Sequence, residues 1–175
     1  MKIVTTPMCE DILKLAGIKE FDTSSNPDST NADIAVVLSE TDTMMKSIKI
    51  KLNTFTQIKT SVKLLREMFG TESAELDLRT IEYIKFDRSV NRNIKVKVYS
   101  NFLRDIVDDL GFTIVSEDPD YLVYPDYNRN VLSNEIVTMG DRVVEIPSHK
   151  NAPKDPIKRA ETRYKLMEKK LCTKP

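Results

Sequence analysis

Cys9 is the residue of this sequence whose position best suits nucleophilic chemistry. It follows a short apolar strand and falls in the first turn of the helix expected to begin at Pro7. A helix N-terminus stabilises a thiolate, which would suit a nucleophile, a redox thiol or a soft metal ligand. The carboxylates of Glu10 and Asp11 oppose ionisation of the thiol, and a small buried cysteine that only packs is the alternative. We therefore name Cys9 as the candidate catalytic residue and leave the packing role open.

Polar side chains gather in four turns, each of which follows a predicted strand. Open α/β sheets bind ligands outside the carboxyl ends of their strands, so these turns form the candidate binding site. Two of the turns start helices, whose amide protons and positive dipole ends suit an anionic group. The candidate ligand-binding residues are Thr5, Thr6, Met8, Ser39, Glu40, Thr41, Tyr99, Ser100, Asn101 and Asp126.

The sequence predicts no metal site and identifies no cofactor. His149 is the only histidine, which excludes a site with two histidine ligands. Glu40 and Asp42 follow a strand, but one acidic turn is weak support for a magnesium site. Cys9 and Cys172 lie at opposite ends of the chain, and we expect no disulfide between them in a reducing compartment.

The first of these turns belongs to a strand–helix–strand unit at the start of the chain. Thr6 is placed to cap the helix, Pro7 suits its first position, and Gly17 supplies the left-handed residue that ends it. A short strand is expected from residue 18 to 21, and a buried strand at residues 34–38. Alternation of strands and helices predicts an α/β fold with parallel strands.

A second copy of this unit begins near residue 94. The strand predicted at residues 96–99 leads to a Ser100 cap, a helix that ends at Gly111, and strands at 112–115 and 121–124. The expected caps and the terminating glycines are both 94 residues apart, from 100 minus 6 and 111 minus 17. This agreement favours a structural duplication, although any two strand–helix–strand units share such features.

The other segments are assigned by apolar spacing. A helix capped by Thr54 is expected to end at Gly70, and a lysine- and arginine-rich helix at Pro156 to Leu171 is expected to pack on the sheet or on a partner. The remaining expectations are a strand or helix at 44–51, a helix or strand pair at 75–86, a polar linker at 87–93, and one or two strands around a turn at 139–141.

These assignments predict an α/β protein with one or two mainly parallel sheets flanked by helices, and a C-terminal helix that packs back. Residues 1–87 would form the N-terminal half and residues 94–175 the C-terminal half, in one compact domain or two lobes.

The composition gives no indication of binding to nucleic acid or membrane. The 27 basic and 27 acidic residues cancel, so no global field attracts nucleic acid or an anionic membrane. No stretch approaches the roughly 20 apolar residues of a membrane span, and the chain opens directly on a strand. We therefore expect a cytoplasmic protein that binds neither nucleic acid nor membrane. The oligomeric state does not follow from the sequence.

The opening TTPMCEDILKLAG, followed by a loop and ADIAVVLSE, resembles the start of cobalamin- and siderophore-binding proteins. The first helix of that class is matched by Glu10, Ile12, Leu13, Leu15 and Gly17, and residues 32–35 match a later strand. The resemblance implies a nitrogenase-like, two-lobed α/β arrangement with a ligand between the lobes, although the export signal and long connecting helix of the class are missing. In style the chain is also similar to short cytosolic proteins of methanogenic archaea that have no assigned activity.

Three functions remain open at this point. The first is a non-catalytic module that binds a small anionic or metal-bearing ligand in a cleft between two halves. The second is an assembly or accessory protein, in methanogen metabolism, that contacts a protein partner through the basic C-terminal helix. The third is an enzyme that depends on Cys9.

Overall fold

The chain folds into two compact units, each with its own parallel sheet and helices. The structure, a computed structural model, describes residues 1–71, 88–148 and 150–172. The first unit holds the described residues up to 71 together with 154–157, and the second holds the other described residues. Within the described part of the chain, no helix combines the length and apolar character that a membrane span requires.

The first unit contains a four-stranded sheet in the order β2-β1-β3-β4, with all strands parallel. In the central strand pair, Val4 lies opposite Ala35. The apolar run of β3 is buried from Ile34 to Val37, as expected for a strand covered on both faces. The strands are β1 (Ile3–Thr5), β2 (Asp22–Thr23), β3 (Ile34–Leu38) and β4 (Ser47–Ile50).

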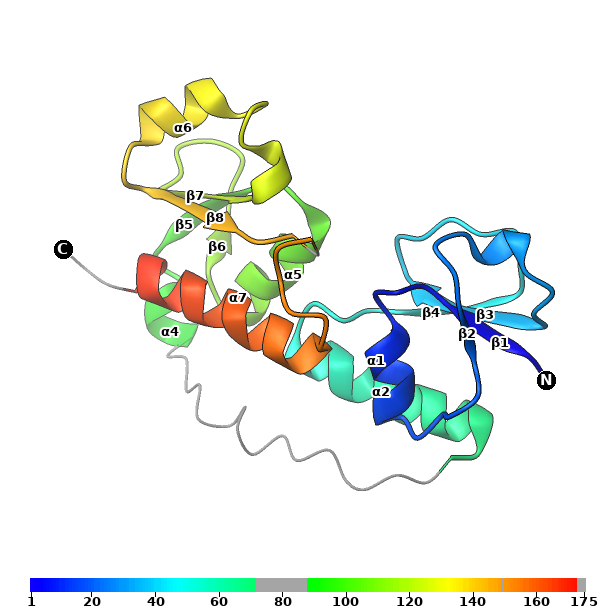
Figure 1. The fold of residues 1–175 in the computed structure, drawn as a ribbon. Coiled ribbons are helices and arrows are strands. Elements are labelled where there is room, and N and C mark those ends of the chain that lie inside the picture. Colours follow the sequence, from blue (N-terminus) through cyan, green and yellow to red (C-terminus); the bar gives the residue numbers. More distant parts are fainter. Residues whose placement is uncertain (72–87, 149, 173–175) are drawn as a thin grey trace. The chain divides into compact units, whose positions relative to one another are not determined.

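Two helices cover one face of this sheet (Figure 1). The longer helix begins with a capping box, in which Thr54 and Gln57 each bond the other's backbone amide, and it ends at Gly70 with a φ of 62°. The shorter helix packs against it. The helices are α1 (Glu10–Leu15), the 3-10 turn η1 (Pro27–Ser29) and α2 (Phe55–Phe69).

The second unit repeats the topology, with a parallel sheet in the order β6-β5-β7-β8. In both sheets the chain goes from the first strand to one neighbour through a helix, then crosses to the other side. The strands are β5 (Lys95–Val98), β6 (Thr113–Ile114), β7 (Tyr121–Pro125) and β8 (Val143–Ile146).

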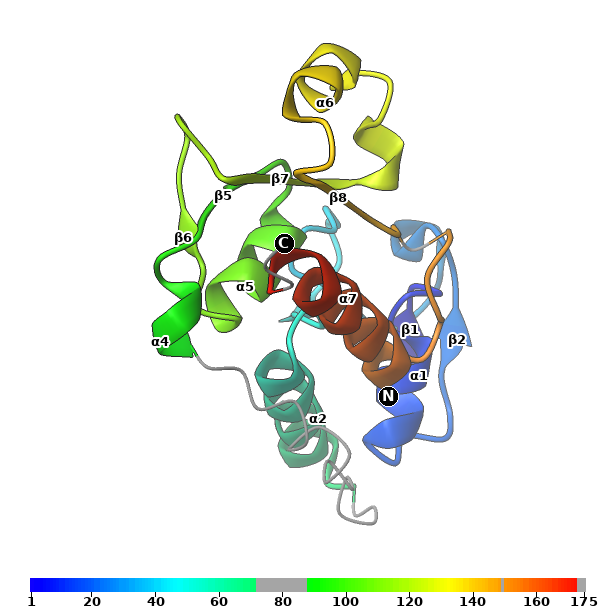
Figure 2. The ribbon, with the colours of Figure 1, turned by 90° about the vertical axis from the view of Figure 1, so that its left-hand side faces the viewer.

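Helices cover both faces of the second sheet. Figures 1 and 2 show α6 on one face, and α5 with α7 beside it on the other. Leu122 and Tyr124 of the sheet pack with Leu132 and Ile136 under α6. The helices are α4 (Arg88–Asn91), α5 (Asn101–Asp109), the 3-10 turn η2 (Asp126–Asn128), α6 (Ser133–Met139) and α7 (Pro156–Leu171).

The two units also match in detail at the ends of α1 and α5. The carbonyl of Leu13 accepts a hydrogen bond from the amide of Ile18, and the carbonyl of Val107 accepts the corresponding bond from Phe112. The glycines between them have φ values of 82° at Gly17 and 84° at Gly111. The four fully buried side chains of the first segment are Cys9, Ile12, Leu13 and Ala16, and the residues 94 positions later, Leu103, Ile106, Val107 and Leu110, are also fully buried.

The α/β class, the parallel sheets and the C-terminal helix are therefore confirmed, and the two halves are related in topology. The bounds predicted for the halves, 1–87 and 94–175, stay a prediction. The segment predicted as 75–86 lies outside the described residues. Residues 44–51 contain the strand β4, which resolves that ambiguity in favour of the strand.

Three local predictions are wrong. Thr6 does not cap α1, because residues 6–9 form a turn in which the Thr6 carbonyl accepts from the Cys9 amide, and the helix starts at Glu10. The strand expected at 18–21 forms later, as β2. A strand before the turn at 139–141 is not found, because the segment there forms the helix α6, whose apolar stripe covers the sheet face; the strand after the turn forms as predicted, as β8.

Candidate functional site

The carboxyl edge of the second sheet brings two of the predicted turns together. β5 and β7 are adjacent parallel strands, with Val98 opposite Val123. The chain leaves β5 for β6 on one side and returns to β7 on the other, so this edge is the topological switch point of the sheet. Ser100 and Asn101 follow β5, and Asp126 follows β7. Open α/β sheets bind their ligands at this position.

The N-terminus of α5 lies at this edge. The Ser100 hydroxyl oxygen accepts a hydrogen bond from the amide of Leu103 at 3.3 Å, which confirms the predicted cap. Asn101, the first residue of the helix, is exposed. The amide groups of the first turn and the positive end of the helix dipole favour a negative charge here.

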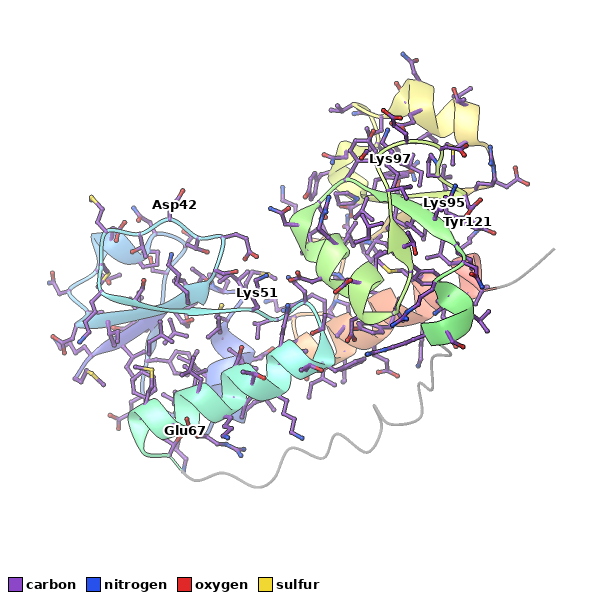
Figure 3. The ribbon with its side chains drawn as sticks, turned by 180° about the vertical axis from the view of Figure 1, so that it is seen from behind. Asp42, Lys51, Glu67, Lys95, Lys97 and Tyr121 are labelled. Atoms are coloured by element: carbon purple, nitrogen blue, oxygen red, sulfur yellow. The ribbon has the colours of Figure 1, made fainter. Side chains whose placement is uncertain are left out.

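Tyr99 faces the other side of the sheet, towards α6. Its hydroxyl donates to Glu135, whose second carboxylate oxygen accepts from Lys97 at 2.7 Å. The hydrogen bonds to Glu135 and Tyr99 raise the pKa of Lys97 to about 12. Burial opposes ionisation of Glu135, but its bonds from Lys97 and Tyr99 prevail and lower its pKa. Figure 3 labels Lys97 in this part of the unit. This cluster is a satisfied ion pair, and it holds α6 on the sheet.

Asp126 is only partly satisfied. Asn151 donates to its Oδ2 atom at 2.7 Å, whereas Oδ1 is buried and accepts no hydrogen bond from the described residues. Burial opposes ionisation, but Asn151, Ser148 and the amide of Tyr127 outweigh it and lower the pKa of Asp126. The carboxylate is therefore ionised at neutral pH, with one oxygen that lacks a donor.

Arg163 of α7 is a buried cation next to the first turn of α5. It is 4% exposed, and its guanidinium carbon lies 4.5 Å from the centre of the Phe102 ring. Its Nε and Nη2 atoms donate to the carbonyl of Pro147 at 3.3 and 3.2 Å. Burial and the charge of Arg159 lower the pKa of Arg163 to about 10, against the opposing effects of Asp126 and Tyr127.

The positive charge of Arg163 has no ion-pair partner among the described residues. A buried charge is costly unless a counter-ion and hydrogen bonds compensate it, and bonds from a charged donor are usually about 2.7–2.9 Å long. The bonds to Pro147 are longer than this and go to a neutral acceptor. Arg159, one turn earlier on α7, is also buried and donates to the carbonyl of Pro153 at 3.2 Å. Arg163 is therefore a buried cation that forms no ion pair with an acidic side chain of the described residues.

The candidate residues of the first unit are less available to a ligand. Thr5 is fully buried, and its hydroxyl donates to the carbonyl of Val36 at 2.7 Å. The carbonyl of Thr41 accepts a bond from Lys49, and the Ser39 amide pairs with the carbonyl of Ile50. The side chains of Thr6, Met8 and Thr41 are half-buried, and those of Ser39 and Glu40 are exposed.

Cys9 lies at the first turn of α1 but faces the core. Its side chain is fully buried, it forms no disulfide, and Leu103 occupies the corresponding position in the second unit. Only a packing role is common to both residues. α1 has six residues, against nine in α5, so the two predicted helix N-termini are not equivalent. Reactivity of Cys9 stays a prediction.

Sequence reasoning missed Arg159 and Arg163. The sequence predicts a lysine- and arginine-rich helix at 156–171 but does not distinguish its arginines from its lysines. In the structure both arginines are buried, whereas four lysines are exposed: Lys158, Lys165, Lys169 and Lys170. The spacing of the arginines could have shown the difference. Arg159 and Arg163 are four residues apart, and each directly precedes a residue of the apolar stripe, Ala160 and Tyr164.

Among residues 1–71, 88–148 and 150–172, no three histidine, cysteine, aspartate or glutamate side chains are grouped to hold a metal ion. His149 lies outside the described residues.

The comparisons with known proteins establish similarity of fold. No family model matches the sequence, and no curated protein matches it. The structure is similar to that of the metal-dependent lipoprotein YcdH from Bacillus subtilis, with a TM-score of 0.55 and 11% identity over 99% of this chain and 100% of that one.

Two further structures come from Streptococcus pneumoniae. Zn(II)-bound AdcA gives a TM-score of 0.49 and 13% identity, covering 98% of this chain and 56% of that one. The Zn(II)-bound ZnuA-like domain of AdcA gives 0.46 and 14%, covering 98% and 96%. The expected likeness to ligand-binding α/β proteins holds at the level of fold, whereas the likeness to cobalamin- and siderophore-binding proteins and to archaeal proteins stays a prediction.

Proposed function

We propose that this protein is a non-catalytic binding module that takes a small anionic ligand at the carboxyl edge of its second sheet. The buried, uncompensated charge of Arg163 carries the proposal. A guanidinium at this position can donate to a carboxylate or phosphate oxygen. The N-terminus of α5 lies close to Arg163, because Phe102 in its first turn contacts the guanidinium. This helix end adds amide donors and the positive end of the helix dipole, which also favour an anion.

The fold similarity to YcdH, described as metal-dependent, raises the question of a bound metal. The sequence has one histidine and two cysteines, and among the described residues no three histidine, cysteine or carboxylate side chains are grouped. Zinc sites draw three or four ligands from histidine, cysteine and carboxylate side chains. The residues present therefore do not fit a bare zinc ion, whereas a metal held within an anionic ligand is compatible with Arg163.

Thermal unfolding with a panel of probes tests the proposal. A ligand present at 100 times its Kd stabilises the native state by about 2.7 kcal/mol. We expect at least one of acetate, citrate, phosphate and sulfate to raise the unfolding midpoint of the wild-type protein and not that of Arg163→Met. Lys165→Met is the matched control, because it removes one positive charge from an exposed position of the same helix.

Two outcomes would count against an anion site. If no anion shifts the wild-type midpoint, or if the shift is the same in Arg163→Met, the proposed site is wrong. If zinc chloride alone raises the midpoint in the wild type and in both variants, a bare metal ion is the ligand instead.

A second candidate function is assembly with a protein partner through α7. The observation that favours it is the exposure of four lysines on this helix, Lys158, Lys165, Lys169 and Lys170. Removal of the helix would not test it, because Tyr164 and Met167 are fully buried in the core. Reversal of the charge at Lys158, Lys169 and Lys170 should instead abolish partner capture at an unchanged unfolding midpoint, and retained capture would exclude this role.

A further inference from the structure

Asp126 lies at the same edge as Arg163 and carries the opposite charge. The two groups interact electrostatically, since the carboxylate favours the charged form of the guanidinium. No ion pair forms between them. Asn151, Ser148 and the amide of Tyr127 stabilise the Asp126 carboxylate, but its Oδ1 atom has no hydrogen-bond donor among the described residues. The edge therefore holds a cation, Arg163, and an anion, Asp126, that interact electrostatically without forming an ion pair.

The two groups offer different hydrogen-bonding partners to a ligand. Arg163 uses Nε and Nη2 on the carbonyl of Pro147, and its Nη1 atom makes no hydrogen bond within the described residues. Asp126 keeps Oδ1 as an acceptor without a donor. Buried acceptors are almost always bonded, and a charged one that is not carries a cost that a donor would remove.

From this pairing we infer that the ligand is a small acid with a single carboxylate and an N–H or O–H donor beside it, as in amino and hydroxy acids. The inference rests on the proposed function and names the ligand class of that site. The ligand carboxylate accepts from Arg163 and from the first turn of α5, and its neighbouring donor bonds to Asp126. The ligand donor bonds to Oδ1, while the exposed Asn151 side chain continues to hold Oδ2.

The charge of Asp126 also selects against other anions. Sulfate carries two negative charges, has no O–H donor at neutral pH, and presents only oxygens towards an ionised carboxylate, which repels it. Simple carboxylates such as propionate fit Arg163 but leave Oδ1 of Asp126 without a donor. Asp126 is therefore the specificity-determining residue, and Arg163 is the anchor.

Binding of four small probes to the full chain, measured by calorimetry, tests the inference. L-lactate and L-alanine carry a donor beside the carboxylate, propionate lacks it, and sulfate is a dianion. We expect lactate or alanine to bind the wild-type protein at least about tenfold more tightly than propionate, the size of one hydrogen bond to a charged group, and sulfate to bind most weakly. Asp126→Asn should remove the preference over propionate and strengthen sulfate binding.

The outcomes separate the inference from the proposed function. The role of Asp126 is wrong, and the anion site stands, in either of two cases. In the first, Asp126→Asn keeps the wild-type preference for lactate or alanine over propionate; in the second, sulfate binds the wild type most tightly. If Arg163→Met binds the probes unchanged, or if neither these four probes nor acetate, citrate and phosphate bind the wild type, the proposed function itself fails. Asn151→Ala is a second variant that leaves both charged groups in place. It should increase the preference for lactate over propionate, and a decrease would also overturn the inference.

Discussion

Replacement of Arg163 by methionine should stabilise the ligand-free protein. The side chain is buried, and its pKa lies at about 10 instead of the ordinary 12.5. One pKa unit corresponds to 1.36 kcal/mol, so the charged form is disfavoured in the fold by roughly 3 kcal/mol. Methionine has a similar length, no charge, and a flexible side chain that fills the space beside Phe102.

The lost contacts offset part of this gain. The carbonyl of Pro147 loses its donor and the Phe102 ring loses a cation, which together cost about 2 kcal/mol. The net expectation is an increase of about 1 kcal/mol in the free energy of unfolding, similar to the gains seen when buried charges are replaced by apolar residues. For a chain of this size the midpoint should rise by about 2–4 °C.

Chemical denaturation of the wild type and of Arg163→Met, in anion-free buffer, measures the difference. Lys165→Met should change the free energy of unfolding by less than about 0.5 kcal/mol, because Lys165 is exposed and pairs with Glu161 on the same helix. A loss of more than about 2 kcal/mol in Arg163→Met alone would show that the arginine is well satisfied by its own fold. Arg163 would then not be an anion-binding residue.

Three further predictions follow from the site and its surroundings. Glu135→Gln should destabilise the second unit by about 1–2 kcal/mol in urea denaturation. Because the folded-state pKa of Glu135 is lowered, its contribution should be present above about pH 4.5 and lost below it, and in the variant this acid-dependent loss should be absent. Ser100→Ala removes the α5 cap and should cost about 1 kcal/mol by the same measurement, whereas no change would contradict the cap. Cys9 should react with iodoacetamide far more slowly than the exposed Cys172 in native protein and at a similar rate in urea, and fast native labelling of Cys9 would restore the enzyme hypothesis.

Local sequence rules were sufficient where a few neighbouring residues decide the structure. The Thr54 cap with Gln57, the left-handed glycines and the buried run of β3 each depend on contacts within one turn or one strand pair. They were sufficient for the α/β class, for the repeated unit, and for the placement of Ser100 and Asp126 after strands. They failed at Thr6, where a turn delays the helix, and at α6, where β-branched residues form a helix because the sheet face below needs an apolar cover.

The charge of the site was decided by the tertiary structure alone. Arg163 meets Phe102 and Pro147 because α7 packs beside α5, and no local pattern specifies which face of a basic helix is turned inward by that packing. The same packing leaves the lysines of α7 in water and strips water from its arginines. Sequence predicted which turns follow the strands, because strand ends and helix starts depend on local residues. The fold determined which sign of charge is buried there, because desolvation depends on every segment that surrounds a group.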